Sequence, residues 1–328
     1  MLRGQAANLY STLRIILTSW SLHGGYSFRE GFRWPAASKW TRAINQETME
    51  YTSEWSEIRK ASGPPTMRER VRSYVLSLAS LTSRPKAGPS LRLIYLHNVF
   101  KDQVEQFERQ IEYLSSTGSF LTTAEVLATV HGEKPLERRC FHLSFDDGFR
   151  NVITNALPVL ISHGIPATFF VPTERISADF RSASEYGRSA KYYPSVLEMA
   201  TWDDLGKAQE HGLDIASHTR SHARFSDISS STTRMQEEIG GSKADIEREL
   251  GRPCLYISWP FGTLRDADTP SLDQVKRSGY SACFGAYRGS VRPGKTDPYS
   301  IPRHHFEAHW PLSHLKYFAH GAGEKHLE

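Results

Sequence analysis

Two neighbouring carboxylates, Asp146 and Asp147, are the residues of this sequence best placed to do chemistry. They follow the apolar run 140–145 (CFHLSF), which predicts a buried strand, and they precede Gly148, which lets the chain turn. In parallel α/β folds, active sites form at the carboxyl ends of strands. Aspartate and glycine are also common in turns, and aspartate caps helices, so a structural role remains the alternative for this pair taken alone.

Two histidines four residues apart, His218 and His222, follow another predicted strand, 213–217 (LDIAS). Both imidazoles can face one metal ion if the backbone between them makes a helical turn. A pair of exposed loop histidines is the alternative. Together with Asp147, they supply two nitrogens and one oxygen and leave coordination positions open, which is typical of a catalytic metal site rather than a structural one.

The elements that must position these side chains alternate along the chain. Repeating strand–helix units predict a parallel sheet or a barrel. Thr201, followed by Asp204, predicts the start of a helix with a capping box. Segment 173–200, rich in Ser, Arg and Tyr, is expected to be an inserted loop that borders the site. Further strands are predicted at 91–96, 167–171, 255–259 and 281–284, and helices at 104–114, 151–163, 233–250 and 271–278.

The first quarter of the chain differs from the rest. Residues 67–81 carry apolar side chains at helical spacing, and residues 83–90 (SRPKAGPS) read as a linker. We therefore expect an N-terminal extension of unknown role over 1–85 and a second domain over 86–328. Residues 1–85 hold 12 Lys and Arg but 6 Asp and Glu, whereas the remaining residues hold 28 and 30, so the net charge of +4 belongs to the extension.

Three segments, in this order, resemble the first three motifs of polysaccharide deacetylases, the NodB-homology enzymes of carbohydrate esterase family 4. The segments are 144–148 (SFDDG), 218–222 (HTRSH) and 258–262 (SWPFG). Segment 95–99 (YLHNV) is similar to the Tyr-His motif on the first strand of many members. The resemblance covers roughly residues 91–310. It implies an α/β fold, an irregular (β/α)7-type NodB-like barrel, here with an N-terminal and mostly helical extension.

The resemblance also implies an activity, the metal-dependent removal of N-acetyl groups from an amino-sugar glycan or glycan precursor with release of acetate. Asp147, His218 and His222 would bind the divalent metal. Zn²⁺ fits this ligand set best, with Co²⁺, Ni²⁺, Mn²⁺ or Fe²⁺ as alternatives. Asp146 would be the general base that deprotonates the attacking water.

The third motif and the first strand supply further expected site residues. The backbone N–H of Phe261 would stabilise the oxyanion of the tetrahedral intermediate, with Pro260 fixing its position at the substrate. His97 is expected to face the site and contact substrate, and a buried histidine bonded to backbone is the alternative. Tyr186, Tyr192 and Tyr193, in segment 173–200, are candidate stacking faces for sugar rings, unless they pack in the core.

The sequence departs from the family pattern at Ser258, where many members carry an arginine that orients the basic aspartate. Some branches instead use an arginine on a late strand, and segment 301–303 (IPR) resembles that arrangement, so we expect Arg303 to orient Asp146; a surface arginine is the alternative. The family often supplies the general acid as a late histidine. His305 and His314 are the candidates, and spacing does not separate them.

Composition limits the partners. Cys140, Cys254 and Cys283 are far apart, which argues against a disulfide framework or a thiolate zinc site. No apolar run reaches the ~18 residues of a membrane-spanning helix, although the stretch 9–20 could pack on the main domain or touch a membrane surface. The basic residues are scattered, so no nucleic-acid partner is expected. The expected partner is an N-acetylated oligo- or polysaccharide. No signal peptide is recognised, which predicts a cytoplasmic location, and the oligomeric state stays open.

Two other functions remain as alternatives. The barrel could be a catalytically inert carbohydrate-binding or scaffold protein, or it could hydrolyse small amides that are not sugars. The intact set of Asp146, Asp147, His218 and His222 argues against the inert alternative, because clustered charges are costly to keep without a role. A broad groove with aromatic walls would favour a glycan, and a small closed pocket would favour a small amide.

Overall fold

The structure is a computed structural model that describes residues 50–83, 88–189, 195–322 and 324 of the 328-residue chain. The description below covers the unit Tyr51–Glu328, which contacts between residues mark off as compact. The apolar stretch 9–20, residues 84–87 of the predicted linker, Tyr192 and Tyr193 lie outside the described residues.

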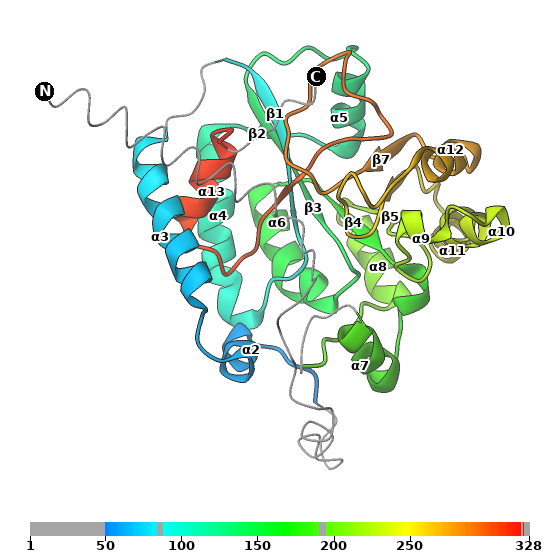
Figure 1. Ribbon diagram of the computed structural model, residues 1–328, viewed down its shortest axis with the longest axis horizontal. Coiled ribbons are helices and arrows are strands. Elements are labelled where there is room, and N and C mark those ends of the chain that lie inside the picture. Colours follow the sequence, from blue (N-terminus) through cyan, green and yellow to red (C-terminus); the bar gives the residue numbers. More distant parts are fainter. Residues whose placement is uncertain (1–49, 84–87, 190–194, 323, 325–328) are drawn as a thin grey trace, which may run out of the picture. The chain divides into compact units, whose positions relative to one another are not determined.

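A curled sheet of parallel strands forms the centre of this unit (Figure 1). Its strand order is β7-β6-β5-β4-β3-β1-β8, and β2 pairs with β3. Before β8, Ile301 forms a parallel bridge with Phe284 of β7, while β8 itself pairs with β1. One short segment thus joins the two ends of the sheet, which gives the irregular α/β barrel predicted from the sequence. The strands are β1 Ser90–Leu96, β2 Ser119–Phe120, β3 Arg139–Phe145, β4 Ala167–Val171, β5 Leu213–Ser217, β6 Tyr256–Ser258, β7 Ala282–Phe284 and β8 His304–His305.

Helices surround the sheet and alternate with its strands. Thr201 caps α8, because its hydroxyl accepts from the N–H of Asp204 at 3.0 Å while the Asp204 carboxylate accepts from the N–H of Thr201, the capping box that the sequence predicts. The α-helices are α2 Trp55–Ser62, α3 Met67–Thr82, α4 Val104–Thr117, α5 Thr123–Val130, α6 Leu157–His163, α7 Phe180–Ser189, α8 Trp202–Glu210, α9 Phe225–Ile228, α10 Thr232–Met235, α11 Gly241–Leu250, α12 Thr269–Arg277 and α13 Leu312–Ala319. Lys101–Gln103 (η2) and Thr173–Arg175 (η4) are 3₁₀ turns, and Val152–Ala156 (η3) and Gln236–Gly240 (η5) are π turns.

Three predicted elements differ from the structure. The helix expected over 151–163 contains η3, a π turn that precedes α6. The helix expected over 233–250 is interrupted by η5, a π turn between α10 and α11. The prediction that 173–200 is an inserted loop is wrong in part, because it contains η4 and α7. Ala183 and Tyr186, three residues apart on α7, are buried together in a small apolar cluster, and this short stripe was hidden among polar residues in the sequence.

Helix α3, which precedes the predicted domain boundary at residue 85, packs beside α13 near the other end of the chain (Figure 1). The Ser77 hydroxyl contacts that of Ser313 at 3.1 Å, and the Ser73 hydroxyl contacts Nε2 of His314 at 3.4 Å. The division into an extension and a catalytic domain stays a prediction. Among the described residues, no helix is both long and apolar enough to cross a bilayer.

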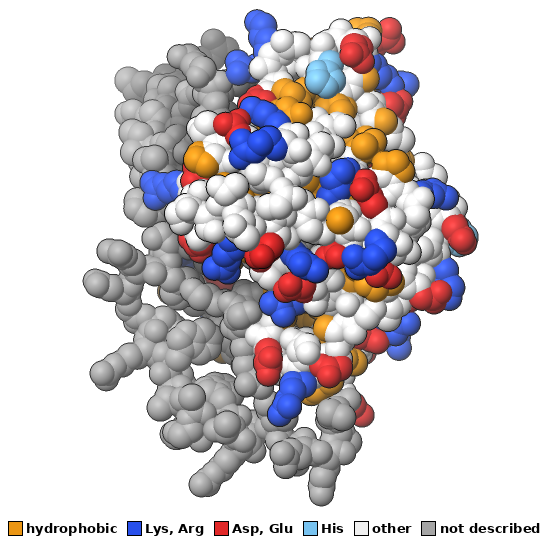
Figure 2. All heavy atoms as spheres, turned by 90° about the vertical axis from the view of Figure 1, so that its right-hand side faces the viewer, with side chains coloured by type: hydrophobic (Ala, Val, Ile, Leu, Met, Phe, Trp, Pro, Cys, Tyr) orange, Lys and Arg blue, Asp and Glu red, His pale blue; other side chains and the backbone are white. Residues whose placement is uncertain are grey.

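The surface formed by α10, α11 and α12 carries Lys and Arg interspersed with Asp and Glu (Figure 2). Ion pairs on α11 and α12 join neighbouring side chains of opposite sign, Lys243 with Glu247 at 2.9 Å and Lys276 with Asp273 at 3.3 Å. Such pairs contribute little to stability. They leave this face close to neutral, in keeping with the balanced counts of basic and acidic residues after residue 85.

Candidate active site

The two neighbouring aspartates emerge where β3 ends and the chain turns. The N–H of Asp146 still bonds to the carbonyl of Leu96 at 3.0 Å, as a continuation of the pairing with β1. Asp147 then adopts the left-handed region at φ 76°, followed by Gly148 at φ 77°. Aspartate tolerates this region better than most residues. The abrupt turn sends the two carboxylates, both buried, to different partners.

One of these carboxylates lies between the two predicted metal-binding histidines. Oδ1 of Asp147 is 3.5 Å from Nε2 of His218 and 3.2 Å from Nε2 of His222. Burial raises the pKa of the Asp147 carboxyl, but its contacts with the two imidazoles outweigh burial and hold that pKa well below its usual range. Asp147 is therefore ionised and is a ready ligand.

The loop that carries both histidines makes a bend rather than a helical turn. Thr219 and His222 have φ angles of 65° and 69°, in the left-handed region. These two residues turn the loop sharply, so the two imidazoles come together although no helical turn lies between them. The rings of His218 and His222 meet edge-on, with centroids 4.9 Å apart. Nδ1 of His218 lies 2.8 Å from the carbonyl oxygen of Ser258 and donates to it, so Nε2 is the ligand nitrogen of the neutral ring and faces Asp147.

These three side chains fit a divalent cation. One ligand atom from each of Asp147, His218 and His222 lies within 4.8 Å of the others. Oδ2 of Asp147 is buried and has no hydrogen-bond partner, although a buried carboxylate oxygen without a partner is costly. A cation at this position would satisfy that oxygen, so the donor set and the orphaned atom agree.

Arg303 lies directly against Asp146. Its Nη1 and Nη2 donate to the two carboxylate oxygens at 2.7 and 2.8 Å, a bidentate pair. The guanidinium is fully buried, so Arg303 is not a surface residue. It also donates to the hydroxyls of Ser144 at 3.1 Å and Ser258 at 2.8 Å. Ser258, the departure from the family pattern, thus contacts the guanidinium of Arg303, the residue immediately before β8.

A second cluster lies beside the first and centres on Glu307. Its Oε1 is 2.6 Å from Nδ1 of His97 and 2.8 Å from Nε2 of His305. Burial lowers the pKa of His97, but the charge of Glu307 outweighs it and raises that pKa to about 9, with smaller contributions from Asp147 and Asp146. Sequence reasoning missed Glu307. Its signal is the spacing of two from His305, which puts both side chains on one side of an extended segment.

The other predicted residues lie outside the two side-chain clusters around Asp147 and Glu307. Phe261, at φ 65°, is half exposed, with its ring centroid 5.1 Å from that of His222, and Pro260 before it is buried. His314 lies on α13, where its Nε2 contacts Ser73 of α3. Tyr186 is buried with its ring 5.8 Å from His222, so the expectation of an open stacking face is wrong for this residue.

Comparison with known proteins agrees with the motifs. Residues 133–283 match the family model for polysaccharide deacetylase. The chain is 26% identical over 202 residues to poly-beta-1,6-N-acetyl-D-glucosamine N-deacetylase of Staphylococcus epidermidis; the match covers 61% of this chain and 65% of that protein's length.

Solved structures share the fold. IcaB from Ammonifex degensii superposes with a TM-score of 0.59 at 20% identity, over 71% of this chain and 98% of the other. The Streptococcus pyogenes deacetylase PplD gives a TM-score of 0.54 at 16% identity, over 71% of this chain and 97% of the other. The family match, the order of the motifs and the barrel all agree: residues 133–283 belong to the polysaccharide deacetylase family.

Proposed function

We propose that the protein is a metal-dependent hydrolase that removes N-acetyl groups from an amino-sugar glycan or glycan precursor and releases acetate. One observation carries the proposal: the orphaned, buried Oδ2 of Asp147 sits with two imidazoles beside a second aspartate that Arg303 holds. The family match and the relative named as a poly-beta-1,6-N-acetyl-D-glucosamine N-deacetylase support a glycan substrate.

Asp147, His218 and His222 would hold the cation, with Zn²⁺ as the best fit to one carboxylate and two imidazoles, and Co²⁺, Ni²⁺, Mn²⁺ or Fe²⁺ as alternatives. A divalent ion bound there polarises the amide carbonyl and acidifies water. The hydrogen bond from His218 to the Ser258 carbonyl fixes the tautomer that can act as a ligand.

Asp146 would take the proton from the attacking water. Its Oδ2 lies 4.0 Å from Nε2 of His218, beside the proposed metal ligands, while both of its oxygens accept from Arg303. Arg303 is a positioning residue in this proposal, because its two N–H groups fix the plane of the Asp146 carboxylate before substrate arrives. The backbone N–H of Phe261, whose ring packs against that of His222, would stabilise the oxyanion.

His97 would donate the proton that the leaving amine needs. Its pKa of about 9 keeps the imidazole protonated at neutral pH, and Glu307 fixes the orientation of the ring through Nδ1, which directs Nε2 away from Glu307. His305 contacts the same carboxylate through its own Nε2, and His314 is engaged by Ser73. Of the three histidines, His97 therefore fits the general acid best.

The substrate class can be tested with purified protein. Metal-stripped protein is reloaded with Zn²⁺ or Co²⁺, and acetate release is measured from N-acetylglucosamine oligomers and from small acetamides that are not sugars. We expect release from the oligomers, none from Asp147→Asn, and full release from Asp203→Asn, a matched change at an exposed aspartate. Release from the small amides alone would support the alternative hydrolase, and release from neither would support the inert barrel.

A further inference from the structure

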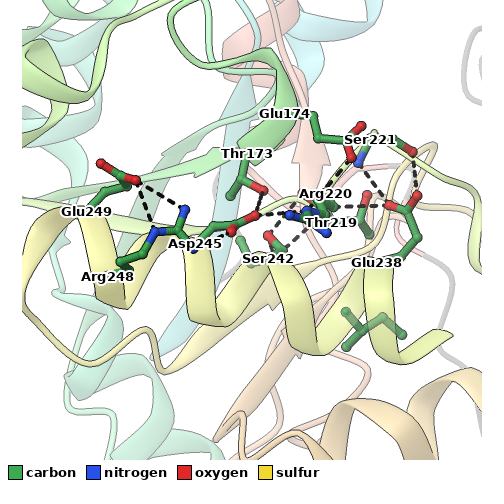
Figure 3. Close-up of polar contacts among 12 residues, drawn as sticks. Thr173, Glu174, Thr219, Arg220, Ser221, Glu238, Ser242, Asp245, Arg248 and Glu249 are labelled. Atoms are coloured by element: carbon green, nitrogen blue, oxygen red, sulfur yellow. Dashed lines mark hydrogen bonds and ion pairs between the residues drawn. The ribbon is translucent and has the colours of Figure 1, made fainter. Parts of the chain in front are cut away.

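The loop that carries the two metal-binding histidines rests on one face of the helix that follows it (Figure 3). That face belongs to η5 and α11 and presents Glu238, Ser242 and Asp245. The spacing of four and three residues places these side chains on one side of a helix. All three are buried, with exposed fractions of 7%, 0% and 6%, so their polar atoms need partners inside the protein.

Glu238 binds the middle of the loop. Its Oε2 accepts the backbone N–H groups of Arg220 and Ser221 at 3.1 and 2.9 Å, and its Oε1 accepts the Ser221 hydroxyl at 2.6 Å (Figure 3). Arg220 and Ser221 lie between the two histidines in the sequence. The Glu238 carboxylate therefore accepts three hydrogen bonds from the segment between the two histidines. The conformation of this segment sets the distance between the two imidazoles.

Ser242 and Asp245 hold the same loop nearer to His218. The Ser242 hydroxyl donates to the carbonyl of Thr219 at 3.0 Å, and Asp245 accepts from Nε of Arg220 at 3.0 Å (Figure 3). Asp245 also accepts from the hydroxyl of Thr173, in the segment that follows β4, at 2.9 Å. The loop is thus tied both to the helix and to a neighbouring strand end.

This support matters because the loop is strained. Thr219 and His222 are not glycines, yet both occupy the left-handed region, which persists only where surrounding contacts impose it. The helix is also irregular where it contacts the loop, because Glu238 lies within the π turn η5. Single π turns inside α-helices are frequent at functional sites.

We propose that Glu238, together with Ser242 and Asp245, positions the two histidines of the loop for the metal ion. Glu238 does so by accepting hydrogen bonds from the loop, and its negative charge is not required. The inference rests on the metal site proposed above. The amide of glutamine can still accept the two backbone N–H groups through its oxygen, while its NH₂ donates to the Ser221 hydroxyl. Glu238→Gln should therefore keep the loop, and Glu238→Ala should release it.

The test measures Co²⁺ binding by metal-stripped protein, from its visible absorption and from competition with a chelator. We expect Glu238→Ala to raise the dissociation constant about 10- to 100-fold, the usual effect of losing a group that orients a metal ligand. Glu238→Gln should stay within about threefold of wild type, because the acceptor is kept. Glu237→Ala, a change at the exposed neighbour, is the matched control and should bind as wild type.

Melting temperatures separate positioning from a purely structural role. If Glu238 had a purely structural role, Glu238→Ala would lower the melting temperature equally with and without Co²⁺. If Glu238 positions the histidines, a fixed concentration of Co²⁺ should raise the melting temperature of Glu238→Ala less than that of wild type. If Glu238→Ala does not fold, Ser242→Ala tests the same face, with an expected loss of about threefold or more in Co²⁺ affinity.

Wild-type affinity in Glu238→Ala, or in Ser242→Ala where that variant replaces it, would overturn the positioning role while the metal site stands. An equal loss of Co²⁺ affinity in Glu238→Gln and Glu238→Ala would overturn the claim that Glu238 acts by accepting hydrogen bonds rather than through its charge. Failure of wild-type protein to bind Co²⁺ would overturn the metal site itself, and with it both proposals.

Discussion

Replacing Glu307 by glutamine should move the pH dependence of the reaction in a calculable way. The charge of Glu307 raises the pKa of His97 to about 9 against the effect of burial, which lowers it. Glutamine removes that charge while burial remains, so the pKa of His97 should return to 6.5 or below. The fall in the pKa of His97 from about 9 to about 6.5 corresponds to about 3 kcal/mol of lost preference for the protonated imidazole.

The expected rates follow from the protonated fraction. At pH 7.5, about 97% of His97 is protonated at a pKa of about 9 and about 10% at a pKa of 6.5, so the turnover number should fall roughly tenfold. At pH 6.5 the same calculation gives a ratio of about two. A cation bound nearby lowers the pKa of His97 in both proteins, so the variant should always be measured against wild type under the same metal.

Acetate release from an N-acetylglucosamine oligomer, measured between pH 6 and 9, tests this directly, together with NMR titration of the His97 imidazole. Glu105→Gln, at an exposed glutamate of α4, is the matched control and should keep the wild-type profile. A ratio of wild-type to Glu307→Gln turnover that stays constant across this range would refute the role of His97 as the proton donor.

Two further predictions concern stability. Arg303→Met leaves the buried Asp146 carboxylate without its partner and should lower the free energy of unfolding by about 3–5 kcal/mol, measured by urea denaturation, whereas Arg109→Met at an exposed arginine should change it little. Because the folded-state pKa of His97 lies above its unfolded value of 6.5, its stabilising contribution is fully present below pH 6.5 and is lost as the pH rises through about 9. The stability gap between wild type and His97→Gln should therefore shrink by up to about 3 kcal/mol between pH 6.5 and 9.5, and a constant gap would contradict it.

Much of the fold could be predicted, because the strands have a clear signal in the sequence. Strands β4 and β5 match their predicted bounds, since short apolar runs flanked by polar residues mark buried parallel strands. Helix α7 could not be predicted, because its stability comes from one short buried stripe against a distant cluster rather than from a long periodic pattern.

The site shows the same division between local and distant information. Asp147, His218 and His222 could be placed together because each follows a strand end, and strand ends share one edge of a parallel sheet. The contacts of Glu238 and Glu307 could not be predicted, since they depend on how a helix and a late extended segment return to that edge. The bend between the histidines also depends on those contacts, because left-handed backbone at Thr219 and His222 has no signal in the residue types.

If Asp147, His218 and His222 form one metal site, as we propose, hydrolysis requires that this site is filled. Metal-stripped protein should be titrated with Co²⁺ while metal binding and acetate release from an N-acetylglucosamine oligomer are followed in the same sample. We expect both signals to rise together, to saturate near one equivalent of Co²⁺ per chain and to vanish in Asp147→Asn. Full acetate release by the metal-stripped protein, or release that Asp147→Asn retains, would contradict it.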